Sequence, residues 1–177
     1  KNANAAVFVG GNDGMLHAFD ADTGVETFAL IPHGVIPKLG RLAEASYSHE
    51  FFVDGPLSLA NAYRGAWKTV LTASAGAGAK SIFALDVSNP GALNGSKLLW
   101  EIHDHASLGY VTQPIQVGVL PNGRWIAVVG NGFGSKKGTG SILVIDLWNG
   151  NIISEVAVPG GKNGIGGVRL IRDIHNV

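Results

Sequence analysis

A short phrase that recurs three times constrains this chain more than any other feature of its sequence. Mostly apolar residues lead to an aspartate that opens a turn at Met15–Asp20, Ser81–Asp86 and Ser141–Asp146. The three aspartates are 66 and 60 residues apart, and each is followed by a further strand-like run. Asp, Asn and Gly tolerate the left-handed backbone of tight turns, so this punctuation indicates antiparallel β-meanders. A meander that repeats at such an interval predicts the blades of a β-propeller.

The predicted fold is an all-β, quinoprotein-dehydrogenase-like β-propeller, of which the chain carries about three to three and a half four-stranded blades of an incomplete ring. The first blade has only three strand runs, at Val7–Gly10, Met15–Phe19 and Glu26–Ile31. We expect the chain to be a piece of a longer protein whose open sheet edges make it poorly soluble or self-associating when expressed alone. The predicted divisions are blade one at 6–32, an insertion at 33–50, blade two at 51–104, blade three at 110–159 and the start of blade four at 164–177.

Two prolines mark equivalent places in the later blades. Pro56 and Pro114 cannot donate a hydrogen bond to a strand ladder, so each should lie at a strand start, a bulge or an edge. The loop Val87–Ser96 is predicted to be irregular. The predicted first strands are Phe52–Ala62 in blade two (broken near Gly55-Pro56), Pro114–Leu120 in blade three and Val168–Ile171 in blade four.

Residues 33–50 interrupt the repeat and are predicted to form a short helix or an ordered loop. Pro37 suits the first turn of a helix. Leu39, Leu42 and Ala43 recur at helical spacing on one face. The segment either caps a sheet edge or binds a partner, because loops on rigid scaffolds often carry function. The candidate partner-binding residues are Lys38, Arg41, Tyr47 and His49.

Bulk composition excludes several classes of function. The net charge is zero and only 15% of the residues are charged, which leaves no electrostatic footprint for nucleic acid or an anionic membrane. The chain has no cysteine, so it supplies neither disulfides nor thiolate chemistry. No apolar run approaches the roughly 18 residues of a membrane helix. We therefore expect no nucleic-acid partner and no membrane span.

Two glycine-rich stretches and a histidine pair invite a chemical interpretation. Gly130–Gly134 and Gly76–Gly78 are not followed by a helix whose N-terminus could meet a phosphate, so they do not predict a nucleotide site. His103-Asp104-His105 has no third or fourth ligand nearby and is predicted to be a polar loop. His17 alternates with Met15 and Phe19, and it is predicted to be a satisfied histidine between two blades.

The turn Asp20–Gly24 resembles a calcium loop only superficially. Its glycine falls at the fifth position, and Glu26 is too close to act as the closing bidentate ligand. Asp20 is therefore predicted to cap its own turn, as Asp86 and Asp146 would in theirs. No serine–histidine–aspartate or paired-carboxylate constellation is evident. We predict a protein that is not an enzyme, with no catalytic residue, cofactor or metal ligand in this chain.

Three stretches resemble the C-terminal β-propeller of PilY/PilC-type proteins, which act at the tip of type IV pili. They are Val7–Asp20, Ile31–Gly55 and Trp67–Val87, and the likeness covers nearly the whole chain. The resemblance implies a cell-surface protein of the pilus tip, exported through the periplasm and outer membrane. It also implies that the protein promotes pilus assembly and surface adhesion by protein–protein binding. The implied partners are pilin and minor pilin subunits and a host or surface receptor.

Under this resemblance, the protein acts as a rigid disc that presents loops, chiefly Val35–His49 and Val87–Ser96, to its partners. The family also uses a calcium loop on a later blade, for which the nearest register here is Arg172–Val177. Only Asp173 and Asn176 offer side-chain oxygens there. No metal ligand is therefore assigned to this chain, and calcium is a candidate cofactor of the full-length protein only.

Two alternatives remain open. One is a PQQ-type quinoprotein dehydrogenase, whose blades carry an A-x-D-x-x-T-G-x-x-x-W phrase that Asp20–Gly24 matches, although the closing aromatic is Phe28. The other is a scaffold propeller of outer-membrane assembly. Dye-linked alcohol oxidation in the presence of quinone and calcium would distinguish the dehydrogenase from both binding proteins.

Overall fold

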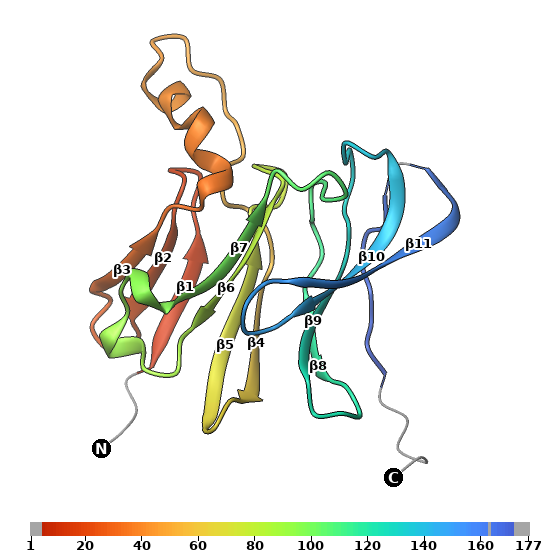
Figure 1. The fold of residues 1–177 in the computed structure, drawn as a ribbon. Coiled ribbons are helices and arrows are strands. Elements are labelled where there is room, and N and C mark those ends of the chain that lie inside the picture. The colour runs from red at the N-terminus through yellow and green to blue at the C-terminus, as the bar shows by residue number, and fades with distance from the viewer. Residues whose placement is uncertain (1–4, 163, 172–177) are drawn as a thin grey trace.

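Three antiparallel sheets stand side by side in the computed structural model, which describes residues 5–162 and 164–171 (Figure 1). Each sheet is a simple meander whose neighbouring strands are consecutive in the chain. The described sheets do not close into a ring. The first sheet contains β1 (Ala6–Gly10), β2 (Leu16–Asp20) and β3 (Glu26–Leu30). The second contains β4 (Leu57–Tyr63), β5 (Trp67–Ser74), β6 (Ser81–Asp86) and β7 (Leu98–His103). The third contains β8 (Gln116–Val119), β9 (Trp125–Gly130), β10 (Thr139–Asp146) and β11 (Ile152–Lys162).

The prediction of an incomplete, all-β propeller is confirmed by this architecture. We refer to the three sheets as blades one, two and three. The predicted short helix of the insertion is also present, as the 3₁₀ helix η1 (His33–Ala43). The loop Val87–Ser96, predicted to be irregular, instead contains η2 (Pro90–Ala92) and the start of η3 (Gly95–Lys97).

The middle blade is buried on both faces, which explains its long apolar runs. In β6, Ile82 and Ala84 belong to the core shared with blade three, whereas Phe83 and Leu85 belong to the core shared with blade one. This alternation follows from the two-residue period of a strand. A side-chain bond also crosses to blade three, because Trp100 Nε1 donates to the carbonyl of Leu147 at 2.8 Å.

β4 begins at Leu57, directly after the predicted break near Gly55-Pro56, so only the part of the predicted strand before that break is not strand. Phe52 and Val53 are both fully buried, but the ladder between β4 and β5 starts only at Leu57. Their amides instead bond to the turn of blade one: Phe52 N donates to Asn12 Oδ1 at 3.1 Å, and Val53 N donates to the carbonyl of Gly11 at 3.3 Å. This segment therefore ties blade two to blade one.

Three further strand limits differ from the predictions. β8 begins at Gln116, not at Pro114, which lacks the amide hydrogen that a ladder needs. β11 runs on to Lys162, past the predicted end of blade three at residue 159, because β10 still pairs with it beyond a register shift near Thr139. Val168–Ile171 has no strand assignment in the structure. The rest of the predicted blade-four start, residues 172–177, lies outside the described residues, and so do Asp173 and Asn176.

The outer face of blade one exposes two valines of β1. Val7 and Val9 are 55% and 45% exposed, while Leu16 and Ala18 on the opposite face are fully buried against blade two. Exposed apolar sheet faces of this kind favour association. The expected self-association of the isolated chain stays a prediction.

Candidate functional site

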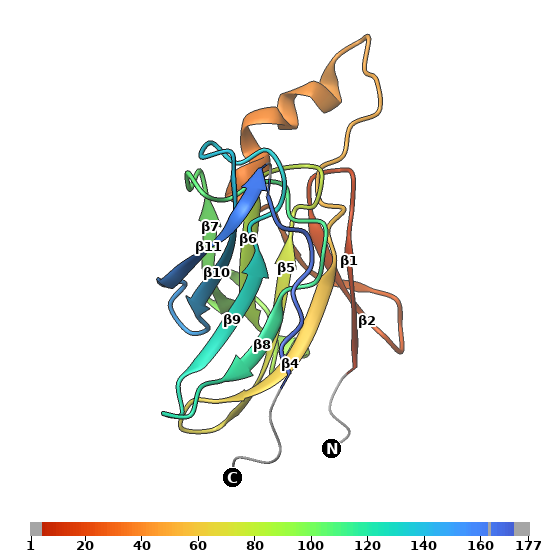
Figure 2. The same cartoon turned by 90° about the vertical axis from the view of Figure 1, so that its right-hand side faces the viewer.

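The insertion and several loops gather at one end of the blades, which we call the insertion end. β3 leads into η1, and β4 starts at the same end of the blades. Because successive strands of a meander run in opposite directions, the β5–β6 turn and the β9–β10 loop also lie at this end (Figures 1 and 2). The β6–β7 loop, which contains Val87–Ser96, lies at the opposite end. The two loops predicted to be presented to partners, Val35–His49 and Val87–Ser96, therefore lie at opposite ends of the blades.

A buried carboxylate from blade two holds the root of the insertion. Glu101, on β7, has a side chain only 6% exposed. It accepts hydrogen bonds from the amides of His33 at 2.9 Å and Gly34 at 3.0 Å, and from Ser81 Oγ at 2.7 Å. Pro32, the residue before η1, supplies no side-chain cap, so Glu101 satisfies the unpaired amides of the first turn. A negative charge is also favoured at that position by the helix dipole.

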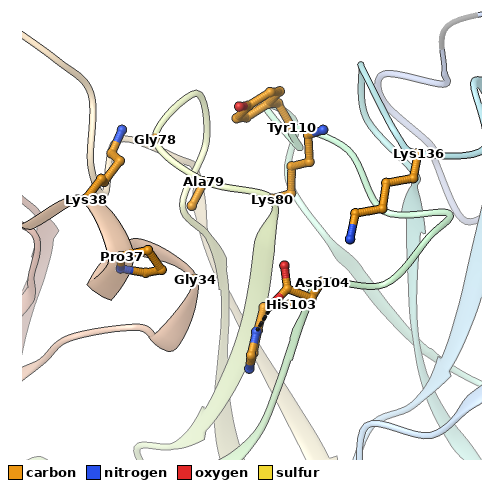
Figure 3. A pocket seen from close by; sticks show the side chains of 10 residues that line it. All are labelled: Gly34, Pro37, Lys38, Gly78, Ala79, Lys80, His103, Asp104, Tyr110 and Lys136. Carbon is orange, nitrogen blue, oxygen red and sulfur yellow. Dashed lines mark ion pairs between the residues drawn. The ribbon is translucent and has the colours of Figure 1, made fainter.

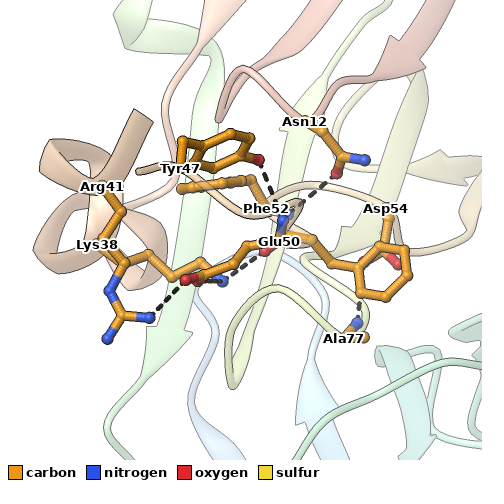
Figure 4. A network of polar contacts seen from close by, with 9 residues as sticks. Asn12, Lys38, Arg41, Tyr47, Glu50, Phe52, Asp54 and Ala77 are labelled. Atoms are coloured by element: carbon orange, nitrogen blue, oxygen red, sulfur yellow. Dashed lines mark hydrogen bonds and ion pairs between the residues drawn. The ribbon is translucent and has the colours of Figure 1, made fainter. Parts of the chain in front are cut away.

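The far limb of the insertion is organised around Glu50 (Figure 4). Arg41 Nη1 donates to Glu50 Oε1 at 2.6 Å, and Lys38 Nζ lies 3.7 Å from Glu50 Oε2. Tyr47 Oη accepts a hydrogen bond from Glu50 N at 3.1 Å. The bond from Arg41 lowers the pKa of Glu50, with charge attraction from Arg41 and Lys38 adding to it and partial burial opposing it.

Three of the four predicted partner-binding residues thus turn toward Glu50 and brace the insertion. Lys38 Nζ also donates to the carbonyl of Phe51 and lies 4.6 Å from the centre of the Phe52 ring. The fourth residue, His49, meets the ring of Phe51 edge-on at 5.3 Å. The structure brings these residues together as a structural network, and Lys38 additionally lines a pocket.

The predicted apolar face of the insertion helix is wrong. Leu42 and Ala43 are exposed, while Val35 is fully buried and Leu39 packs at the core between blades one and two. η1 meets the core between blades one and two only through Val35 and Leu39, and its C-terminal end extends away from the blades (Figure 1). Leu39 contacts the tight turn of blade one so closely that a Cβ at Gly14 would lie 2.3 Å from Leu39 Cδ2.

A pocket of about 340 Å³ opens at the insertion end between blades two and three (Figure 3). Its walls come from the insertion, the β5–β6 turn, the end of β7 with the connection that follows it, and the β9–β10 loop. Lys80 Nζ donates to the carbonyl of Gly134 and lies 5.2 Å from the Tyr110 ring centre. The lining residues are Gly34, Pro37, Lys38, Gly78, Ala79, Lys80, His103, Asp104, Tyr110 and Lys136.

Asp104 and His105 lie in the predicted polar loop, whereas His103 is the last residue of β7. His103 stacks on His33 with ring centres 5.7 Å apart and planes 8° apart, and its Nδ1 lies 3.4 Å from Asp104 Oδ2. Asp104 adopts a left-handed backbone with φ of 54°. His105 Nδ1 accepts from Ser107 N at 3.3 Å. Within the described ranges, no group of three or more His, Cys, Asp or Glu residues is placed to hold a metal ion.

The turn-capping role predicted for the three repeated aspartates is confirmed. Asp20 Oδ1 accepts from the amides of Asp22 and Thr23 and from Thr23 Oγ1 at 2.9–3.1 Å. Asp86 Oδ1 accepts from Ser88 N, and Asp146 Oδ1 accepts from Trp148 N, both at 3.0 Å. The Thr23 amide bond lowers the pKa of Asp20. With three donors already on one oxygen, this turn does not fit a calcium loop.

Asn131 explains the glycine-rich stretch at the start of the β9–β10 loop. Its side chain is fully buried and makes four hydrogen bonds. Nδ2 donates to the carbonyls of Ser107 and Thr139, and Oδ1 accepts from the amides of Ser141 and Ile165, at 2.8–3.0 Å. Gly132 next to it has φ of +72°, and a Cβ there would lie 2.3 Å from the carbonyl oxygen of Tyr110. The stretch is a scaffold for the loops that line the pocket.

His17 is satisfied, but its partners come from its own blade, not from a neighbouring one. Nδ1 bonds to Glu26 Oε1 at 2.6 Å and Nε2 bonds to Asp13 Oδ2 at 2.9 Å. The ring also stacks on Phe19 at 5.9 Å. Because Leu16 and Ala18 face blade two, the alternation of the strand places His17 on the outer face.

Because His17 lies between the carboxylates of Glu26 and Asp13, we expect the stability of blade one to depend on pH. The Glu26 bond raises the pKa of His17 above 6.5, with Asp13 adding to the effect and burial opposing it. A raised pKa gives a stabilisation that is complete below pH 6.5 and is lost as the pH rises through the folded-state pKa. The melting temperature of wild type should therefore exceed that of His17→Gln most below pH 6.5, with a gap that narrows at higher pH. A gap that stays constant from pH 5 to pH 9 would contradict this.

No helix in the described part of the chain is long and apolar enough to cross a membrane. Adjacent four-stranded and three-stranded meanders with loops gathered at one end define this molecule as part of a β-propeller. The family model for the PilY1 β-propeller domain matches residues 1–175. The chain therefore belongs to the PilY1 β-propeller domain family.

Named relatives agree with this assignment. The chain is 45% identical over 179 residues to the type IV pilus biogenesis factor PilY1 of Pseudomonas aeruginosa strain PAO1, covering 96% of this chain and 15% of the relative. It is 42% identical over 166 residues to a PilY1 homolog of Xylella fastidiosa, covering 91% and 11%. The crystal structure of the P. aeruginosa PilY1 C-terminal domain matches with a TM-score of 0.79 and 41% identity, over 97% of this chain and 34% of that one. The chain thus spans 11% to 15% of the length of these curated relatives.

Proposed function

We propose that this propeller segment acts in type IV pilus biogenesis, and that it does so by binding other proteins. The observation that carries the proposal is the 45% identity across 96% of the chain to a named type IV pilus biogenesis factor. The match covers the three blades, the insertion and the loops between them, and loops on a rigid scaffold often carry function.

The insertion end is the surface proposed to meet the partners. The insertion is held at its root by Glu101 and at its far limb by Glu50, so it is presented as a rigid element. Rigid elements bind with a smaller loss of conformational entropy than mobile loops. The proposed partners are pilin and minor pilin subunits, with a host or surface receptor for adhesion, and the proposed location is the cell surface at the pilus tip.

Binding, not catalysis, is the proposed mode of action. The relatives reported above are named as pilus biogenesis factors, and none is named as an enzyme. No cofactor is assigned to the described residues. Any calcium dependence is proposed to belong to other parts of the full-length protein.

Complementation of a gene deletion tests the proposed function. Deletion in the organism that carries the gene should remove surface pili, measured by shearing and immunoblotting for pilin, and the wild-type gene should restore them. A version in which residues 36–48 are replaced by a Gly-Ser linker of equal length should restore the protein level but not the pili. Unchanged piliation in the deletion strain would overturn the proposal, and full rescue by the linker version would exclude the insertion as the part of the insertion end that binds.

A further inference from the structure

We propose that the pocket at the insertion end binds an acidic peptide segment of a partner protein, with Lys80 and Lys136 as the groups that receive its carboxylates. The inference rests on the proposed function, because it names the chemistry of the partner at that surface. Three lysines from three different segments line this pocket, together with a single carboxylate. The chain as a whole has no net charge, so this excess of cations is local.

The three ammonium groups are not equally available. Lys38 Nζ is engaged by the carbonyl of Phe51 and by Glu50 (Figure 4). Lys80 Nζ uses one of its three donors on the carbonyl of Gly134, which fixes its position and leaves two donors. Lys136 Nζ has no hydrogen-bond or ion-pair partner within residues 5–162 and 164–171. Figure 3 shows the Lys136 side chain extending over the pocket toward the end of β7.

The one carboxylate of the lining does not neutralise the pocket. The Asp104 side chain is 87% exposed, and its Oδ2 lies 3.4 Å from Nδ1 of the neighbouring His103. A carboxylate as exposed as this is screened by solvent and contributes little to the field inside the pocket. A ligand that carries carboxylates would supply the counter-charge that Lys80 and Lys136 lack.

The shape and lining of the pocket favour a peptide over nucleic acid. A volume of about 340 Å³ accommodates one or two side chains, whereas nucleic acid requires a basic stripe along the surface. Pro37, Ala79 and the 39%-exposed ring of Tyr110 add apolar contacts beside the cations. Tyrosine at a pocket rim, next to groups that can form charge-assisted hydrogen bonds, suits a short peptide with acidic side chains.

The loops that carry the lysines are held in place before any ligand binds. The β9–β10 loop, which carries Lys136, is fixed by the four hydrogen bonds of Asn131. The β5–β6 turn, which carries Lys80, packs so closely that a Cβ at Gly78 would lie 1.8 Å from the carbonyl oxygen of Phe52. Preorganisation of this kind lowers the entropy lost on binding.

The neighbouring lysine provides a matched control. Lys137 is adjacent in the same loop, but its Nζ is paired with Glu155 Oε2 at 2.8 Å and it does not line the pocket. Lys136→Ala and Lys137→Ala therefore remove the same charge from the same loop, and only Lys136→Ala removes it from the pocket. Lys136→Arg keeps the charge and should retain binding.

The test measures binding of a fluorescein-labelled tetraglutamate peptide to the full-length protein by fluorescence anisotropy, with labelled tetraglutamine as the uncharged control. We expect tetraglutamate to bind and tetraglutamine not to bind. Lys136→Ala should weaken binding about tenfold, the loss of one partly desolvated ion pair, while Lys137→Ala should leave it unchanged. Added salt should weaken binding as well.

The inference would be overturned if tetraglutamate did not bind, or if Lys136→Ala and Lys137→Ala weakened its binding equally. It would also be overturned if millimolar inorganic phosphate displaced the labelled peptide as well as unlabelled tetraglutamate does, because the site would then accept any anion. The outcome is separable from that of the proposed function. Peptide binding with unchanged piliation in the deletion strain would refute the pilus role alone. Loss of pili on deletion without peptide binding would refute the acidic-peptide site alone.

Discussion

Replacing Glu101 with alanine is expected to release the root of the insertion and to lower the stability of the protein by about 3 kcal/mol. The variant loses the acceptor for the amides of His33 and Gly34 and for Ser81 Oγ. Hydrogen bonds to charged groups contribute about 1.5–3 kcal/mol each, and a buried donor left without an acceptor costs a further penalty. Solvent that enters at the loosened root offsets part of that sum.

Hydrogen exchange distinguishes release of the insertion from general unfolding. In Glu101→Ala the amide of Gly34 should exchange much faster than in wild type, while amides in β9 should keep their protection. Glu101→Gln retains one acceptor oxygen, so its Gly34 exchange rate should lie between those of wild type and Glu101→Ala. Glu44→Ala removes an exposed carboxylate from the same insertion and serves as the control. We expect the same exchange rate at Gly34 in this variant as in wild type. Wild-type exchange at Gly34 in Glu101→Ala would show that the contact does not hold the insertion.

The second large effect is expected in the core between blades one and two. Phe83→Ala should destabilise the protein by about 3–5 kcal/mol, because Phe83 is fully buried and its removal leaves a cavity that the rigid sheets cannot close. Its neighbours in that core include Leu71, Leu85 and Phe52. Urea unfolding followed by tryptophan fluorescence measures the loss as a shift in midpoint.

Phe133 provides the matched control for this substitution. Its side chain is 48% exposed, so Phe133→Ala removes the same atoms at a much smaller cost, expected to be within about 1 kcal/mol. Similar losses for the two variants would mean that the core between blades one and two does not determine the stability of the protein.

The blades could be predicted from the sequence because their signals are local. Strand periodicity and the capping bonds of Asp20, Asp86 and Asp146 each involve residues only a few positions apart. The sites on the insertion could not be predicted in the same way. Glu101 lies in an ordinary strand, 68 residues from His33, and no local pattern connects the two.

The partner-binding candidates show the same limit. Charge and aromatic character singled out Arg41 and Tyr47, and yet both contact Glu50, a residue without any distinguishing sequence context. Phe52 and Val53 were expected to alternate in a strand because their composition suits one. Their burial instead depends on the turn of blade one, around Gly11 and Asn12, which approaches them only in the folded molecule.

The alternation in β5 and β6 has an evolutionary consequence. Neighbouring residues such as Val70 and Leu71 point into different cores, one toward blade three and the other toward blade one. A substitution at either position can be compensated by changes within the core that it faces, without repacking on the other side of the sheet. Blades built this way can drift apart in sequence one junction at a time, while the stack that they form keeps its shape.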